Sequence, residues 1–172
     1  MGYDEGPPPV FSITRSPFVP SADFAIRPVE AADHAEWLAL WQAYCRHYEV
    51  TLDERVNART WARIADPAEP IHALIAHGED GEPLGLCNYV LHPNTWSDQT
   101  VCYLEDLYVA PQGRRKGVAT AFIERLREIG ERENWFRIYW ITNDANEAAQ
   151  AVYDRIASRS GHIRYEIALA KK

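Results

Sequence analysis

The chain is poor in cysteine and has no long apolar run. Its 172 residues include only Cys45, Cys87 and Cys102, an odd number without C-x-x-C spacing. This pattern argues against a disulfide framework or a cysteine zinc site and favours buried, reduced thiols. No run of 18 apolar residues occurs, and Met1 to Val10 carries acids and three prolines where a signal peptide would be basic and then apolar. We therefore expect a cytoplasmic protein that has no membrane segment.

Basic residues are also in the minority. Lysine and arginine total 18 against 25 acidic residues, which gives a formal net charge of −7. A protein that neutralises many nucleic-acid phosphates needs a net basic face, so the charge argues against a nucleic-acid partner. The six histidines show neither HxH nor HExxH spacing, so no metal site is expected.

Length and composition indicate one globular domain with a short arm before it. Five prolines fall within residues 1–22, which we read as a proline-rich arm. Residues 23–172 are long enough to bury a single core. Apolar periodicity there predicts strands over 24–29, 71–76, 84–91, 101–109, 136–142 and 162–169, and helices over 31–48, 52–64, 117–133 and 143–157.

The most informative segment connects the 101–109 strand to the helix after it. Gln112 to Thr120 reads QGRRKGVAT, with small residues and three consecutive basic ones before a helix. Successive backbone amides at a helix start can cradle a phosphate. The segment lacks the Walker A pattern and the three glycines of a dinucleotide fingerprint. Taken alone, it could also be an ordinary basic loop that caps a helix.

Its neighbours carry a family resemblance. Arg114, Gly117 and Ala119 match the R/Q-x-x-G-x-G/A signature of the GNAT acetyltransferases. The preceding Leu104 to Val109 (LEDLYV) resembles the strand before that signature, particularly in polyamine- and small-amine-acetylating members. Asn146-x-x-Ala149-x-x-x-Tyr153 is similar to the N-x-x-A-x-x-x-Y pattern of the next helix. Three spaced matches in the correct order extend the resemblance over residues 101–165.

The resemblance implies a fold and a donor site. The fold would be α/β (α+β), a mixed, mostly antiparallel sheet of six to seven strands flanked by helices and splayed to admit acetyl-CoA. Asn146 would hydrogen-bond the pantetheine arm, and backbone groups of the 101–109 strand would do the same from Leu107, Tyr108 and Val109. The pyrophosphate would lie on the amides of the loop and helix start, formed by Arg114, Arg115, Lys116, Gly117, Val118, Ala119 and Thr120.

Two residues are candidates for the chemistry. An amine attacks a thioester only when it is unprotonated, and Glu105 lies where related enzymes carry a strand glutamate associated with amine deprotonation. If the strand is regular, Asp106 points to its opposite face. Tyr153 would be the general acid toward the departing thiolate. The alternatives are a salt-bridged or solvent-facing carboxylate for Glu105 and a core tyrosine for Tyr153.

The function implied is an acetyl-CoA-dependent N-acetyltransferase that works by direct attack in a ternary complex, without a metal. A polyamine or other small primary amine is the favoured acceptor. An amino acid, an aminoglycoside, or a protein lysine or N-terminal amine are the alternatives. A non-catalytic acyl-CoA-binding module is the rival class, and retention of both Glu105 and Tyr153 counts against it. Related enzymes commonly pair, so we also expect a homodimer.

Overall fold

The computed structural model describes residues 23–169 and separates them into two units, residues 23–141 and 142–169. The predicted arm, residues 1–22, lies outside the described residues. Each unit is described by itself, and a single domain over 23–172 stays a prediction. None of the described helices is both long and apolar enough to cross a membrane.

The first unit is built on a five-stranded sheet in the order β1-β2-β3-β4-β5. The first four strands pair antiparallel, and β4 and β5 pair parallel. The mixed, mostly antiparallel sheet is therefore confirmed, with five strands instead of six to seven. The strands are β1 (Phe24–Pro28), β2 (Ile71–Gly78), β3 (Pro83–His92), β4 (Val101–Val109) and β5 (Arg137–Tyr139).

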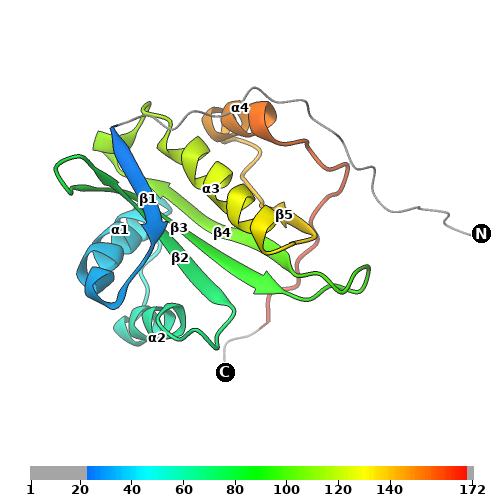
Figure 1. Ribbon diagram of the computed structural model, residues 1–172, viewed down its shortest axis with the longest axis horizontal. Helices are drawn as coiled ribbons and strands as arrows, with labels where there is room; N and C mark the ends of the chain where they lie inside the picture. The colour runs from blue at the N-terminus through cyan, green and yellow to red at the C-terminus, as the bar shows by residue number, and fades with distance from the viewer. Residues whose placement is uncertain (1–22, 170–172) are drawn as a thin grey trace, which may run out of the picture. The chain divides into compact units, whose positions relative to one another are not determined.

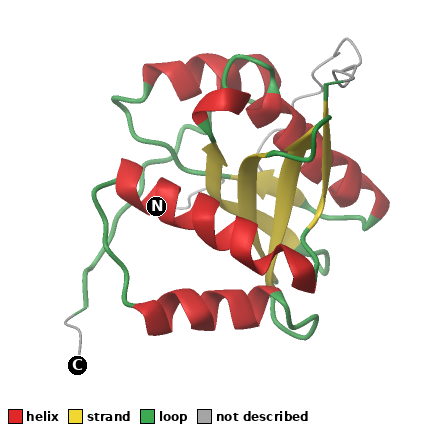
Figure 2. Ribbon diagram, turned by 90° about the vertical axis from the view of Figure 1, so that its left-hand side faces the viewer, coloured by secondary structure: helices red, strands yellow, loops and turns green. Residues whose placement is uncertain are grey.

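Helices cover both faces of this sheet (Figure 1, Figure 2). One face carries α1 (His34–His47), preceded by the 3-10 turn η1 (Ala31–Asp33), and α2 (Glu54–Ile64). Trp37 and Leu40 of α1 and Ile64 of α2 pack there against Ile75 and Leu86 of the sheet. The apolar stripe predicted on the first helix is thus a core stripe, since Trp37 is fully buried.

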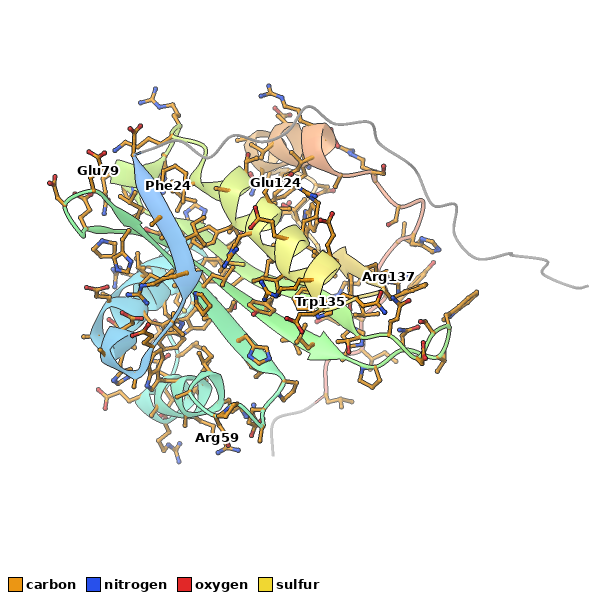
Figure 3. All side chains as sticks on the ribbon, in the orientation of Figure 1. Phe24, Arg59, Glu79, Glu124, Trp135 and Arg137 are labelled. Carbon is orange, nitrogen blue, oxygen red and sulfur yellow. The ribbon has the colours of Figure 1, made fainter. Side chains whose placement is uncertain are left out.

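The other face is covered by α3 (Val118–Arg132), which links β4 to β5. Its buried face includes Phe122 and Leu126, both inaccessible to solvent. At its end, Trp135 packs against Gly130, where an added Cβ would lie 2.9 Å from the indole, and against Tyr89 of β3 (Figure 3). The predicted order of strand, helix and strand over 101–142 is confirmed, and this crossover makes β5 parallel to β4.

The three cysteines are free thiols in the interior. Cys87 and Cys102 are fully buried on β3 and β4, and Cys45 of α1 is 9% exposed. Burial raises the pKa of all three, that of Cys102 to about 12. The expectation of buried, reduced thiols is confirmed.

The second unit contains α4 (Glu147–Ile156). The helix predicted over 143–157 begins four residues later in the structure, at Glu147. Asn146 is the N-cap, and its side-chain oxygen accepts a hydrogen bond from the Ala149 amide at 3.2 Å. Asn143 instead closes the turn before the helix by accepting from the Ala145 amide.

Two predicted strands differ from the structure. The 136–142 strand is reduced to the three residues of β5, and residues 162–169 form no strand. Their alternating apolar side chains are at least 74% exposed at Ile163, Tyr165, Ile167 and Leu169. The apolar alternation is present in the sequence, but within the described part of the chain no strand pairs with this segment. The backbone hydrogen bonds that would make it a strand therefore do not form.

Candidate active site

The first feature of the site is the place where β4 and β5 part. The two strands pair only over three positions, from Val101 with Arg137 to Tyr103 with Tyr139. β4 continues for six more residues, still paired with β3 on its other side. Among residues 23–169, no strand pairs with this edge of β4 beyond Tyr103. Leu107, Tyr108 and Val109 lie in this stretch, so the predicted splay of the sheet is present next to them.

A tight turn then carries the chain from β4 to α3. The Ala110 amide donates to the Leu84 carbonyl at 2.9 Å, and the 3-10 turn η2 (Pro111–Gly113) follows. Gly113 lies so close to β3 that an added Cβ would be 2.8 Å from the Leu84 oxygen, so a side chain there would clash with backbone. The Arg114 Nε donates to the Val109 carbonyl at 3.3 Å, which ties the loop to the end of β4.

Gly117 ends the loop and is the N-cap of α3. Its φ of 84° is in the left-handed region, where glycine pays no Cβ penalty. Its carbonyl accepts from the Ala121 amide at 2.9 Å. The first amides of a helix have no intrahelical acceptor, and here they belong to Val118, Ala119 and Thr120.

The loop before that helix start is basic and solvent-facing. Arg114, Arg115 and Lys116 are all exposed, directly before the amides of the first turn. The helix dipole and the unpaired amides favour an anion at this end, and the three cations add to the same field. The segment predicted to hold a pyrophosphate therefore combines a helix start with three exposed cations, and its binding role stays a prediction.

β4 is not regular at the two adjacent carboxylates. Asn88 of β3 pairs with Asp106, whereas the next residue, Tyr89, pairs with Leu104, so Glu105 is an extra residue in β4. Our expectation that Glu105 and Asp106 point to opposite faces assumed a regular strand, and that assumption was wrong. Glu105 is exposed.

Asp106 is the more enclosed of the two carboxylates. It accepts a hydrogen bond from the Asn88 side-chain nitrogen at 3.1 Å and a second one from Tyr44 of α1. Burial raises the pKa of Asp106, and these two hydrogen bonds partly offset the rise. The oxygen of the Asn88 amide accepts from the Trp37 indole at 3.1 Å. A continuous hydrogen-bonded chain thus joins α1, β3 and β4.

The sequence does not predict these hydrogen bonds between α1, β3 and β4. For Trp37 and Tyr44 the sequence favours a core stripe, on a helix that lines the acceptor pocket in the enzymes that the chain resembles, and the regular-strand argument leaves Asp106 out of the site. The available signal was Asn88, a single amide inside an otherwise apolar strand that is 97% buried in the structure. Such an amide needs polar partners, and these partners are what the chain of hydrogen bonds supplies.

The remaining two predicted residues lie on α4. Asn146 and Tyr153 are seven residues apart, which places them on the same face of the helix with Ala149 between them. All three are half-buried, whereas Glu147 and Asp154 are exposed. Since the Asn146 oxygen is engaged in the cap, its amide nitrogen is the group that remains to donate to a ligand.

A three-residue cluster of possible metal ligands occurs elsewhere in the first unit. Asp33, Glu36 and His77 bring their side-chain ligand atoms within 4.8 Å of one another. Both Asp33 oxygens are, however, bonded to the Arg27 guanidinium, at 2.6 and 2.8 Å, and one also accepts from the Glu30 amide. This geometry is that of a structural ion pair that fastens β1 to the start of α1.

Known proteins resemble this chain in sequence and in fold. The sequence profile described as the acetyltransferase (GNAT) family matches residues 35–157. A D-amino-acid N-acetyltransferase of Saccharomyces cerevisiae is 28% identical over 142 residues, covering 82% of this chain and 88% of that protein. A thialysine N-epsilon-acetyltransferase of Caenorhabditis elegans is 32% identical over 125 residues, covering 72% and 76%.

A solved structure supports the fold at lower identity. AAC(6')-Iy in complex with the bisubstrate analog CoA-S-monomethyl-acetylneamine superimposes with a TM-score of 0.73, at 17% identity, over 87% of this chain and all of that one. At this identity the likeness concerns the fold.

Proposed function

Because the chain belongs to the GNAT acetyltransferase family and is an N-acetyltransferase, we propose that it moves the acetyl group of acetyl-CoA directly onto a small primary amine. One observation carries the proposal. The edge of β4 that β5 leaves uncovered runs directly into the Gly117 turn and the start of α3. An extended chain with a pyrophosphate at one end fits such an arrangement, because strand edge and helix amides are both hydrogen-bond donors.

The donor site would be assembled as follows. Backbone groups of Leu107, Tyr108 and Val109 bind the pantetheine arm as a neighbouring strand would. The amides from Gly117 to Thr120 hold the pyrophosphate, and the side chains of Arg114, Arg115 and Lys116 neutralise it. The Asn146 amide nitrogen adds a hydrogen bond to the pantetheine. The main-chain part of this site is independent of side-chain identity, apart from the positions that require glycine.

The reaction needs one base and one acid. Glu105 takes a proton from the acceptor ammonium, directly or through a water molecule. The freed amine attacks the thioester carbonyl carbon, the new C–N bond forms and the C–S bond breaks. Tyr153 then gives its phenolic proton to the departing thiolate, the nitrogen loses its second proton as the tetrahedral intermediate collapses, and that proton restores the Tyr153 phenol through solvent, so that the products are an N-acetylated amine and CoA. The three cysteines are buried, so an exposed thiol that could carry the acetyl group is absent from the described residues, and a direct transfer is favoured.

The acceptor class is proposed on chemistry and on the relatives. Polyamines were favoured from the sequence, and the relatives are described as acting on a D-amino acid and on thialysine, which are also small amines. Each of these carries an ammonium group at neutral pH, which complements a chain of net charge −7. Aminoglycosides and protein amines are the remaining alternatives.

A thiol-release assay tests the proposal. Acetyl-CoA is offered with polyamines, amino acids of both hands, aminoglycosides and a lysine-rich peptide, and CoA binding is measured in parallel by calorimetry. Turnover with one class supports the proposal and identifies the acceptor. CoA binding without turnover on the whole panel favours a binding module, and the absence of both contradicts the assignment.

A homodimer is proposed as the working assembly. Its support is four exposed apolar side chains at alternate positions, Ile163, Tyr165, Ile167 and Leu169, because exposed apolar side chains that lie together often mark a protein–protein interface. Light scattering should give twice the chain mass of 19.7 kDa. Replacing Ile163 and Ile167 by serine should return the mass to that of one chain, and a monomer in the unaltered protein would contradict the proposal.

A further inference from the structure

We propose that Asp106 binds the ammonium group of the acceptor, and that Asn88 and Tyr44 position it for this role. The inference rests on the proposed function and assigns the acceptor side of the same site. Two observations support it: the hydrogen bonds that run from Trp37 through Asn88 to Asp106, and the groups that surround Asp106.

The orientation of Asn88 is fixed by its two partners. Its oxygen accepts from the Trp37 indole nitrogen, which can only donate. Its nitrogen must therefore face Asp106, to which it donates at 3.1 Å. Because Trp37 is fully buried and Asn88 is 3% exposed, this pair is locked by packing. Asp106 thus receives a donor suited to the ionised carboxylate.

Asp106 lacks a cation among the described residues. Its neighbours there are the Asn88 amide, the Tyr44 hydroxyl and the Cys45 and Cys87 thiols, with Glu105 beside it in β4, and none of these groups is positive. A half-buried carboxylate without a counter-ion is costly in its ionised form. An ammonium group supplied by the acceptor would lower this cost, so the enclosed carboxylate favours a cationic ligand.

The surrounding aromatic rings suit the same ligand. Tyr44 packs edge-on against Tyr108 of β4, with ring centroids 6.3 Å apart, and stacks with Trp41 at 5.5 Å. Ring faces beside a carboxylate attract ammonium groups through their quadrupole. Tyr44 therefore contributes twice, by its hydrogen bond to Asp106 and by its ring.

A purely structural role for the Trp37–Asn88–Asp106 hydrogen bonds predicts a different result. If these bonds only fixed α1 to the sheet, their loss would lower stability and leave acceptor binding unaffected in the protein that remained folded. If Asp106 binds the ammonium, acceptor affinity must depend on its ionisation. Because burial raises its pKa, affinity is present above that pKa and is lost as the pH falls through it. The acceptor remains protonated over that range, so its own titration does not contribute.

The test is equilibrium binding of an amine to the CoA complex, which involves no chemical step. Lysine and 1,4-diaminobutane serve as probes, and turnover of both with acetyl-CoA is measured in the same preparations. Asp106→Asn should weaken binding of the probe that the unaltered enzyme acetylates about 10- to 100-fold and raise its KM by a similar factor, with CoA affinity unchanged. Glu79→Gln, at an exposed acid of the β2–β3 turn (Figure 3), is the matched control and should change neither quantity.

Tyr44→Phe keeps the ring and removes one hydrogen bond to the carboxylate. Because this hydrogen bond lowers the pKa of Asp106, its loss should move the pH midpoint of amine binding upward. The variant should stay folded, so it provides a test even if Asp106→Asn does not fold. A folded Asp106→Asn protein with unaltered amine binding, or an unmoved midpoint in Tyr44→Phe, overturns the inference and leaves the proposed function intact. If neither probe binds nor turns over in the unaltered protein, and no other amine of the panel does, both are overturned.

Discussion

Asn88 and Asp106 face each other across β3 and β4, joined by a 3.1 Å hydrogen bond, at the position where Glu105 is inserted into β4. The inserted residue forms a β-bulge, and the hydrogen bond lies directly beside it in the sheet. One extra residue changes which side chains share a face, and the buried amide holds the next carboxylate in place. The two acids of the LEDLYV strand therefore differ in environment, one exposed and one enclosed.

Tyr153→Phe tests whether Tyr153 is the general acid that protonates the departing thiolate. It removes the phenolic proton and keeps the ring on the half-buried face of α4. We expect kcat to fall about 100-fold, at the low end for a lost general acid because a thiolate is a weak base. Acetyl-CoA affinity, measured by calorimetry, should stay within about twofold. An unchanged kcat would remove Tyr153 from the mechanism. Val152→Ala, one residue away on the same helix, is a control for disturbance of α4.

Glu105→Gln tests the base. The neutral amide cannot accept a proton from the acceptor, so kcat should fall and its acidic limb should flatten. The measurement is the pH profile of kcat at saturating donor and acceptor, because the ionisation of Asp106 acts on acceptor affinity and therefore shapes kcat/KM. An acidic limb with the same midpoint as in the unaltered enzyme argues against Glu105. Because Asp106 acts on affinity and Glu105 on deprotonation, equilibrium amine binding should be nearly unaffected by this substitution.

Gly117→Ala tests the loop, and Gly81→Ala is its matched control. Both glycines have positive φ, 84° and 76°, and an added Cβ meets nothing within 4 Å at either position. Each substitution should cost about 1–2 kcal/mol through left-handed strain, seen as a similar fall in the urea midpoint. Only Gly117→Ala should also weaken CoA binding, because only Gly117 orients the first amides of α3. Equal CoA affinity in the two variants would place the phosphate site elsewhere.

Asp33 gives a prediction about acid stability. Its hydrogen bonds to Arg27 hold the pKa of the carboxyl at about 2, down from 3.8. A depressed pKa stabilises the fold above 3.8, and the contribution is lost as the pH falls toward 2. Asp33→Asn should destabilise the protein by about 1–2 kcal/mol at pH 7, since Arg27 is partly exposed and its pairing is screened. The difference between the two proteins in urea unfolding should shrink below pH 3; a difference independent of pH would contradict the assignment.

The parts of the fold that depend on local pattern were predictable. Alternation gave β4 with its observed bounds, Val101–Val109, and periodicity gave α3 to within one residue at each end. The two strand predictions that were wrong depend on which strands pair with each other. Alternation in 162–169 does not reveal whether a neighbouring strand is present to accept its hydrogen bonds, and the apolar run at 136–142 does not reveal where β5 leaves β4.

The proposed donor side of the site could be picked out from the sequence, because glycine, small residues and a helix start leave a local signature at Gly113 to Thr120. The enclosed carboxylate could not. Its environment is made by Tyr44 and Asn88, which are 62 and 18 residues from Asp106 in the sequence and lie on other elements, and by the extra residue in β4, which no residue type indicates. Long-range contacts of this kind are set by the packing of α1 on the sheet.

The interior position of the cysteines affects how the enzyme can be assayed. Aromatic disulfide reagents, which detect released CoA by colour, react with thiolates that they can reach. With pKa values raised by burial, Cys45, Cys87 and Cys102 should contribute almost no background at pH 8 while the chain is folded. The same reagent added with denaturant should then titrate three thiols per chain, so a single cuvette can report both turnover and the fraction of enzyme that is folded.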